Sequence, residues 1–135
     1  MLRKLFLVLT ILAVGGMCIE VEELVKKWTE LTAAYHEKCM KESQVQLADL
    51  EKLMSISDVP PSKQLACYIN CIYEALELFD DNHEFKKTAL LDKFSYMDER
   101  ALVACIPETR LQTDHCAKSI TFVHCLIKGI LLSHA

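Results

Sequence analysis

Apolar residues recur with the period of an α-helix along most of the chain. In the first such segment charged glutamate and lysine residues separate the apolar positions, which are Val21, Leu24, Val25, Trp28, Leu31 and Tyr35. Spacings of three, four and seven residues bring these side chains to one face. The segment is therefore predicted to form an amphipathic helix with that face turned to a core.

The same period predicts five further helices. Ser43 is expected to cap a second helix, which carries Leu47, Leu50 and Leu53 and ends near Ser55, before Asp58-Val59-Pro60-Pro61 breaks the pattern. Ser62 is expected to cap a third, which ends at Asp80-Asp81-Asn82 and carries Leu65, Ile69, Ile72, Leu76 and Phe79. A short fourth helix is predicted around Thr88 to Phe94, a fifth from its cap Asp98 to a point before Pro107, and a sixth from about Asp114 to Leu131.

Signals for β-strands are weak. The precursor contains three glycines, two of them at positions 15 and 16, so little turn chemistry remains for hairpins. Repeats and interdomain linkers are absent from the sequence. The pattern predicts one all-α domain of about six helices.

The N-terminal residues form a separate segment. Arg3 and Lys4 precede an apolar run from Leu5 to Val14, and Gly15 and Gly16 follow. This order is typical of a secretory signal peptide, and the run is too short to cross a bilayer. We predict a signal peptide over residues 1–18 and a mature domain over residues 19–135, with cleavage two or three residues earlier, or a retained free or lipidated Cys18, as the alternatives.

Removal of residues 1–18 takes away two basic side chains and leaves 13 lysine and arginine residues against 19 acidic ones, a net charge of −6. An acidic protein lacks the basic face that nucleic acids and anionic membranes require. We expect no nucleic-acid partner and no stable membrane association. A chain of this size buries about two thirds of its unfolded surface, which is enough for one core.

Six of the seven cysteines lie in the mature domain, with the spacing C-x27-C-x3-C-x33-C-x10-C-x8-C; they are Cys39, Cys67, Cys71, Cys105, Cys116 and Cys125. Fifteen pairings of six cysteines are open from sequence. This spacing, over the whole mature chain, resembles that of the insect odorant-binding proteins. The resemblance implies three interlocked disulfides, Cys39 to Cys71, Cys67 to Cys116 and Cys105 to Cys125, which join the helices around an apolar cavity.

The resemblance also implies a pocket between the third to sixth helices and the later part of the first. Some helices carry more apolar residues than one buried face needs, for example Ile69, Tyr73 and Leu76 beside the main stripe of the third. These residues either line a pocket or belong to an ordinary core. The predicted ligand-binding residues are Thr32, Ile69, Tyr73, Leu76, Leu90, Phe94, Leu102, Phe122, Leu126 and Ile130.

Two of these residues carry hydroxyl groups suited to orienting a ligand. Tyr73 and Thr32 lie on otherwise apolar faces, where a buried hydroxyl needs a hydrogen-bond partner. For Thr32 the alternative partner is a carbonyl of its own helix. Trp28 either flanks the mouth of the cavity or packs between helices.

The five histidines suggest two further chemistries. A metal site is not expected, because the cysteines are expected to be paired and no H-E-x-x-H motif is present. No cofactor is predicted either. Protonation of His124 and His134, in or after the last helix, would provide a pH-dependent release of ligand, and the alternative is that both are ordinary surface residues.

Ten residues follow Cys125, which is too few for an additional C-terminal helix that enters the pocket. The segment Leu126 to Ala135 is apolar through Ile130, Leu131 and Leu132, so it is expected to form a wall or lid, with Gly129 permitting a bend.

Catalytic motifs are absent from the sequence, including G-x-S-x-G and C-G-x-C-W, so we expect no enzyme and no catalytic residue. The predicted function is an extracellular, secreted carrier that takes small apolar ligands, such as alcohols, aldehydes, esters or terpenoids, through sensillum lymph to an odorant receptor. We expect it to be a monomer or weak homodimer. The alternatives are a carrier in haemolymph or another secretion, and a saposin-like membrane-active protein, although saposin cysteines cluster toward the chain ends.

Overall fold

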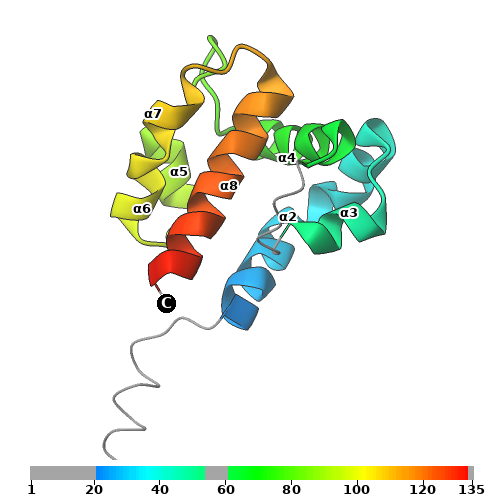
Figure 1. Cartoon of the computed structure of the whole chain (residues 1–135), viewed down its shortest axis with the longest axis horizontal. Coiled ribbons are helices and arrows are strands. Elements are labelled where there is room, and N and C mark those ends of the chain that lie inside the picture. Colours follow the sequence, from blue (N-terminus) through cyan, green and yellow to red (C-terminus); the bar gives the residue numbers. More distant parts are fainter. Residues whose placement is uncertain (1–20, 54–60, 134–135) are drawn as a thin grey trace, which may run out of the picture.

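The computed structural model describes residues 21–53 and 61–133. This part of the chain forms seven helices (Figure 1): α2 (Val21–Ser43), α3 (Leu47–Lys52), α4 (Lys63–Ala75), α5 (Lys87–Lys93), α6 (Glu99–Ala104), α7 (Ile106–Thr109) and α8 (His115–Ser133). Apart from an isolated bridge between Phe79 and Phe85, the described residues make no β-structure. The predicted all-α fold is confirmed.

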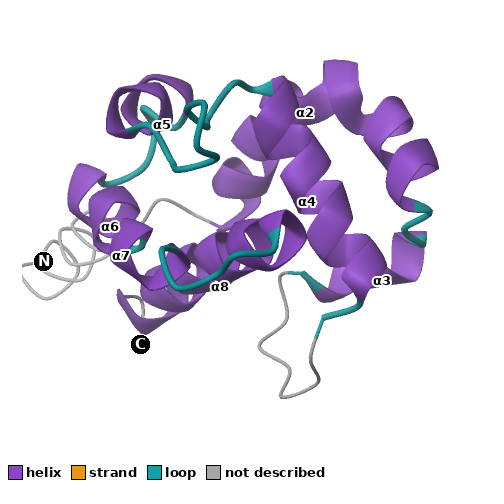
Figure 2. Ribbon diagram, turned by 90° about the horizontal axis from the view of Figure 1, so that it is seen from above, coloured by secondary structure: helices purple, strands orange, loops and turns teal. Residues whose placement is uncertain are grey.

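Helix α4 lies between the two longest helices and packs most extensively against both, α8 and α2. The short helices α5, α6 and α7 lie on one side of α8, and α2 and α3 lie on the other (Figures 1 and 2). The buried core follows the contacts of α4 and includes the fully buried side chains of Ile69, Ile72 and Phe122. Within the described ranges, no helix is both long and apolar enough to cross a membrane.

Two predicted N-caps are confirmed. The Ser62 hydroxyl accepts a hydrogen bond from the Leu65 amide at 3.1 Å, and the Asp98 carboxylate accepts one from the Arg100 amide at 2.9 Å. The Asp114 carboxylate accepts from the Ala117 amide at 2.8 Å and so begins α8 near its predicted start. Each cap satisfies amide groups that lack a partner in the first turn of a helix.

The predicted role of Ser43 is wrong. Helix α2 continues to this residue, whose hydroxyl donates to the Cys39 carbonyl at 2.7 Å and accepts from the Val45 amide at 3.3 Å. Gln44 then reverses the chain with φ 59°, and Gln46 is the N-cap of α3. A serine hydroxyl can satisfy a carbonyl at the end of one helix as well as an amide at the start of the next, so its presence alone does not distinguish the two.

The third predicted helix ends earlier than its apolar stripe. Helix α4 stops at Ala75, and the amides of Glu77 and Leu78 donate to the carbonyls of Glu74 and Tyr73 in a Schellman arrangement. Glu77 occupies the left-handed position with φ 58°. Phe79 therefore lies beyond the helix, in the isolated bridge to Phe85. Its spacing continues the stripe because it remains packed against the core, not because the helix continues.

Helix α6 ends before Pro107 as expected, but a four-residue helix, α7, begins immediately after it. Pro107 lies in the first turn of α7, where the lack of an amide hydrogen removes no helical hydrogen bond. The predicted end of the second helix near Ser55 lies outside the described residues.

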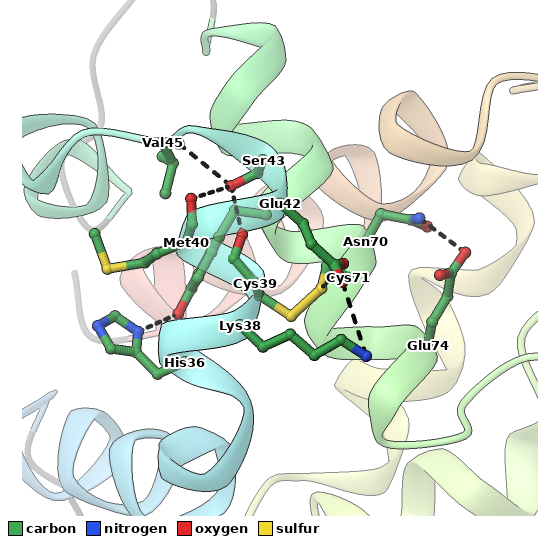
Figure 3. The surroundings of a disulfide bond; sticks show 11 residues. His36, Lys38, Cys39, Met40, Glu42, Ser43, Val45, Asn70, Cys71 and Glu74 are labelled. Atoms are coloured by element: carbon green, nitrogen blue, oxygen red, sulfur yellow. Dashed lines mark hydrogen bonds and ion pairs between the residues drawn. A yellow bond between two sulfur atoms is a disulfide. The ribbon is translucent and has the colours of Figure 1, made fainter.

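Three disulfides join these helices, with the pairing that the family resemblance implied. Cys39 to Cys71 links α2 to α4 (Figure 3), Cys67 to Cys116 links α4 to α8, and Cys105 to Cys125 links the α6–α7 junction to α8. The Cα atoms of the pairs are 5.6, 4.6 and 5.7 Å apart. The two longest helices, α2 and α8, are thus both covalently attached to α4. These links restrict how α2 and α8 pack on α4.

Candidate ligand-binding site

A cavity of about 540 Å³ lies between α2, α3, α4, α8 and the segment that connects α5 to α6. Its volume is within the range of about 300–1,000 Å³ that is usual for small-molecule sites. Most of its wall is apolar and consists of Leu24, Val25, Trp28, Ala33, Ala34, Leu50, Leu53, Phe94, Met97, Val123, Leu126, Ile127 and Ile130. The polar residues on the wall are Thr29, Thr32, His36, Glu37, Tyr68, Tyr73 and Tyr96.

One face of α2 forms a long side of this cavity. The face includes Trp28 and Thr32, which are four residues apart and so lie one above the other on the helix. Val25, Thr29 and Ala33 line the cavity and are also exposed to solvent. They therefore lie at its mouth, which places the opening along α2.

Aromatic rings close the inner end. Tyr73 makes edge-to-face contacts with Trp28, Phe94 and Phe122, at centroid distances of 6.2, 6.4 and 6.0 Å. The rings of Trp28 and Phe94 are close to parallel at 6.3 Å. Trp28 therefore packs α2 against α4 and the end of α5, as the second of its two predicted roles requires, and it also lines the cavity. That it flanks the mouth stays a prediction.

Among the cavity hydroxyls, three have partners within the protein. The Thr29 hydroxyl donates to the Val25 carbonyl at 2.7 Å. The Thr32 hydroxyl donates to the Trp28 carbonyl at 2.9 Å, which is the alternative that the sequence left open. The Tyr68 hydroxyl lies 2.7 Å from His36 Nδ1, a residue of α2 close to the first disulfide (Figure 3). None of these three hydroxyls depends on a ligand for a hydrogen bond.

The Tyr73 hydroxyl differs from these three. It makes no hydrogen bond to any residue in the described part of the chain, although the residue is only 1% exposed. Burial, followed by the proximity of Tyr96, raises the pKa of Tyr73 above its usual value. Burial also raises the pKa of Tyr96 to about 12. Both phenols are therefore neutral at physiological pH and able to donate a hydrogen bond into the cavity.

Five of the ten predicted ligand-binding residues lie on the cavity wall: Thr32, Tyr73, Phe94, Leu126 and Ile130. The other five are buried in the core and do not line this cavity: Ile69, Leu76, Leu90, Leu102 and Phe122. Phe122, for example, stacks on Phe85 at 4.4 Å, behind Tyr73 as seen from the cavity. That any of the ten contacts a ligand stays a prediction.

The wall also includes residues that the sequence did not single out. Tyr96 and Met97 lie between α5 and α6, where no helical period marks them, and His36 and Tyr68 meet only because α2 packs on α4. Leu50 and Leu53 also line the cavity. The sequence predicts the helix that carries them but does not place this helix at the pocket. No residue of α6 lines this cavity, and the contribution of the fifth helix to a ligand site stays a prediction.

His124 lies exposed on α8 and does not line the cavity, and burial of part of its ring lowers its pKa. His134 and Ala135 lie outside the described residues. Ile127 and Ile130, near the end of α8, do form part of the wall, which agrees with the position expected for the C-terminal segment. A role for His124 in ligand release remains an untested prediction.

A helical domain with three interlocked disulfides and an apolar cavity is the architecture of a small ligand carrier. The profile of the PBP/GOBP family matches residues 21–129. The chain belongs to this family, which consists of small odorant- and pheromone-binding carriers and includes the insect odorant-binding proteins that the cysteine spacing resembles. None of the curated proteins matches the chain.

Proposed function

We propose that the protein is an extracellular carrier that reversibly binds one small, mostly apolar ligand in the cavity between α2, α4 and α8. The observation that supports this most directly is the apolar wall around about 540 Å³, with one buried phenol that has no described partner. Ligand binding would restore dispersion contacts to a wall that otherwise faces a void. Membership of the PBP/GOBP family supports the same role.

The polar groups of the wall favour a ligand with one oxygen. Tyr73 and Tyr96 carry neutral hydroxyls near the inner end, suited to the oxygen of an alcohol, aldehyde or ester. The remainder of such a ligand would lie along α2 toward the mouth. Burial of a few hundred Å² at about 25 cal/mol per Å², offset by the loss of ligand freedom, is consistent with affinities of the order of micromolar.

The experiment is displacement of an environment-sensitive apolar dye by a series of alcohols, esters and alkanes. We expect one dye site per chain and competition by medium-sized ligands. Ala33→Phe, which adds a ring at the mouth, should weaken dye binding about tenfold or more. Ala48→Phe is the matched control, because Ala48 is an exposed alanine on α3 that does not line the cavity. Absence of saturable dye binding, or an equal effect of both variants, would refute the proposal.

We further propose that residues 1–18 are removed on secretion, so that the mature chain begins at Ile19 and lacks Cys18. The charged start, the apolar run and the small residues at 15 and 16 support this, as does the even number of cysteines that remains. Intact mass and N-terminal sequencing of the protein secreted by cultured insect cells test it. A mature chain that retains Cys18 would contradict it.

The tissue that produces the protein distinguishes a role in olfaction from another carrier role. A carrier in sensillum lymph that delivers ligand to an odorant receptor and one in haemolymph or a gland secretion would need the same cavity. Localisation of the transcript in antennal sensilla supports the olfactory role, and its restriction to another tissue supports the second.

A further inference from the structure

Three side chains with metal-binding atoms, none of which lines the cavity, meet beside α4. They are Glu74 near the end of α4, His83 in the turn after it and His115 at the start of α8. One oxygen of the carboxylate and one nitrogen from each imidazole lie within 4.8 Å of one another. Glu74 and His83 lie on the two sides of the turn that ends α4, and the packing of α8 on α4 brings the distant His115 to them.

We propose that Glu74, His83 and His115 form a binding site for a divalent transition-metal ion of the zinc type. Two imidazole nitrogens and a carboxylate oxygen suit Zn²⁺, and also Cu²⁺ and Ni²⁺, whereas Ca²⁺ and Mg²⁺ prefer oxygen ligands alone. Water would complete the coordination. The six cysteines are paired in disulfides and do not compete for the ion.

A hydrogen-bond network around Asn70 orients His83 for this role. The Asn70 amide nitrogen donates to the Glu74 carboxylate at 3.0 Å, so the Asn70 oxygen must face the other way. That oxygen accepts from the Ser119 hydroxyl at 2.9 Å and lies 3.1 Å from His83 Nε2. In neutral His83, Nε2 therefore carries the hydrogen and Nδ1 keeps its lone pair. Metal-bound histidines usually have such an acceptor at the second nitrogen.

The backbone of His83 is held equally well. The Asp80 carboxylate accepts hydrogen bonds from the amides of Asn82 and Glu84, at 2.9 and 3.0 Å, which closes the turn. The buried Lys118 ammonium donates to the His83 carbonyl at 3.2 Å. Lys118 also forms an ion pair with Glu84 at 2.7 Å, so a negative charge balances this cation close to the site.

Small movements of the side chains would allow these three residues to coordinate an ion. The rings of His83 and His115 are stacked, with centroids 3.4 Å apart and planes 10° from parallel. An ion must lie in the plane of each imidazole, so the exposed His115 ring has to turn out of the stack. Tetrahedral coordination at about 2.0–2.1 Å would bring the ligand atoms to about 3.3 Å from one another. Glu74 and His115 are both exposed, so the surrounding core need not change.

Isothermal titration of tag-free, disulfide-bonded protein with ZnCl₂ tests the site directly. We expect one Zn²⁺ per chain, no saturable binding of CaCl₂, and a higher melting temperature in Zn²⁺. His115→Ala and Glu74→Gln should each weaken Zn²⁺ binding at least tenfold. His83→Asn should do the same, and it retains a side chain that tolerates the left-handed backbone at this position, where φ is 57°.

His124→Ala is the matched control, since it removes an exposed histidine of α8 that is not part of the cluster. Its Zn²⁺ affinity should equal that of the unaltered protein. Circular dichroism and melting in EDTA establish that each variant is folded before titration. No saturable Zn²⁺ binding by the unaltered protein, or undiminished binding by His115→Ala, would overturn the proposal.

Discussion

Tyr73 connects the core to the cavity at the scale of single residues. Its ring packs against Phe85 and Phe122 on the core side and against Trp28 and Phe94 on the cavity side. The described residues provide no hydrogen bond to its hydroxyl, in contrast to those of Thr32 and Tyr68. The ring therefore contributes to stability, and the hydroxyl is available for ligand recognition.

Tyr73→Phe separates these two contributions. We expect the affinity for an alcohol or ester to fall about two- to tenfold, since one hydrogen bond is worth about 0.5–1.5 kcal/mol. The affinity for an alkane of the same length and the melting temperature should change little, because the ring remains. Dye displacement and thermal melting provide the two measurements. Equal losses for alcohol and alkane would show that the hydroxyl does not contact the ligand.

Phe122→Ala should have the opposite effect: it should lower the stability of the fold more than the affinity for a ligand. Phe122 is fully buried and does not line the cavity, so its removal should leave a void in the core. The free energy of unfolding should fall by about 3–5 kcal/mol, as is usual for such a truncation. Affinity measured at a temperature where the variant is folded should change less than in Leu126→Ala, which shortens a residue of the cavity wall. The reverse order would place Phe122 at the ligand instead.

At the scale of elements, α4 holds the cavity together. Two of its cysteines, one turn apart, bind it to different helices: Cys71 to α2 and Cys67 to α8. Helix α2 supplies the mouth and one long side of the cavity. Close to the first disulfide, the hydrogen bond between His36 and Tyr68 also joins α2 to α4. The first disulfide should therefore matter to binding as well as to stability.

The paired variant Cys39→Ser with Cys71→Ser tests this role against Cys105→Ser with Cys125→Ser. The residues they join are 32 and 20 positions apart, so each loss should destabilise the fold by a similar amount, about 3–4 kcal/mol in the chain-entropy model. Only the first pair should also weaken ligand binding strongly, because it releases α2. Urea denaturation measures the loss of stability, and dye titration measures the loss of binding. Equal losses of binding in the two variants would show that the cavity does not depend on the attachment of α2.

At the scale of the whole molecule, an internal cavity and an excess of acidic groups distinguish a carrier from a membrane-active protein. The precursor has a net charge of −4, and the predicted mature chain is more acidic still. Its apolar side chains face one another around the cavity, and the disulfides oppose the opening that would turn them outward.

The protein should therefore remain in solution with anionic vesicles and cause no leakage, while it binds one small ligand per chain. Sedimentation of vesicles and release of a trapped dye at pH 7 and pH 5 measure both properties. The lower pH is the more stringent condition, because protonation of carboxylates reduces repulsion from the bilayer. Strong vesicle binding without saturable ligand uptake would favour the saposin-like alternative.

The sequence by itself predicted the features that depend on residues close together in the chain. Helical periods marked most helices, and the caps Ser62 and Asp98 are where they were expected, because a cap acts on amides two or three residues away. The cysteine spacing, through its family resemblance, also predicted all three disulfides. Together, these features predicted an all-α domain joined by three disulfides.

Only the tertiary structure decided which apolar residues face a cavity and which face the core. Leu126 and Phe122 lie one turn apart on α8, yet only Leu126 reaches the cavity wall, because Phe122 packs against Tyr73 and Phe85 in the core. The tertiary structure also brought together His36 with Tyr68, and Glu74 with His83 and His115. Such meetings depend on the summed packing of distant segments, which no local spacing encodes.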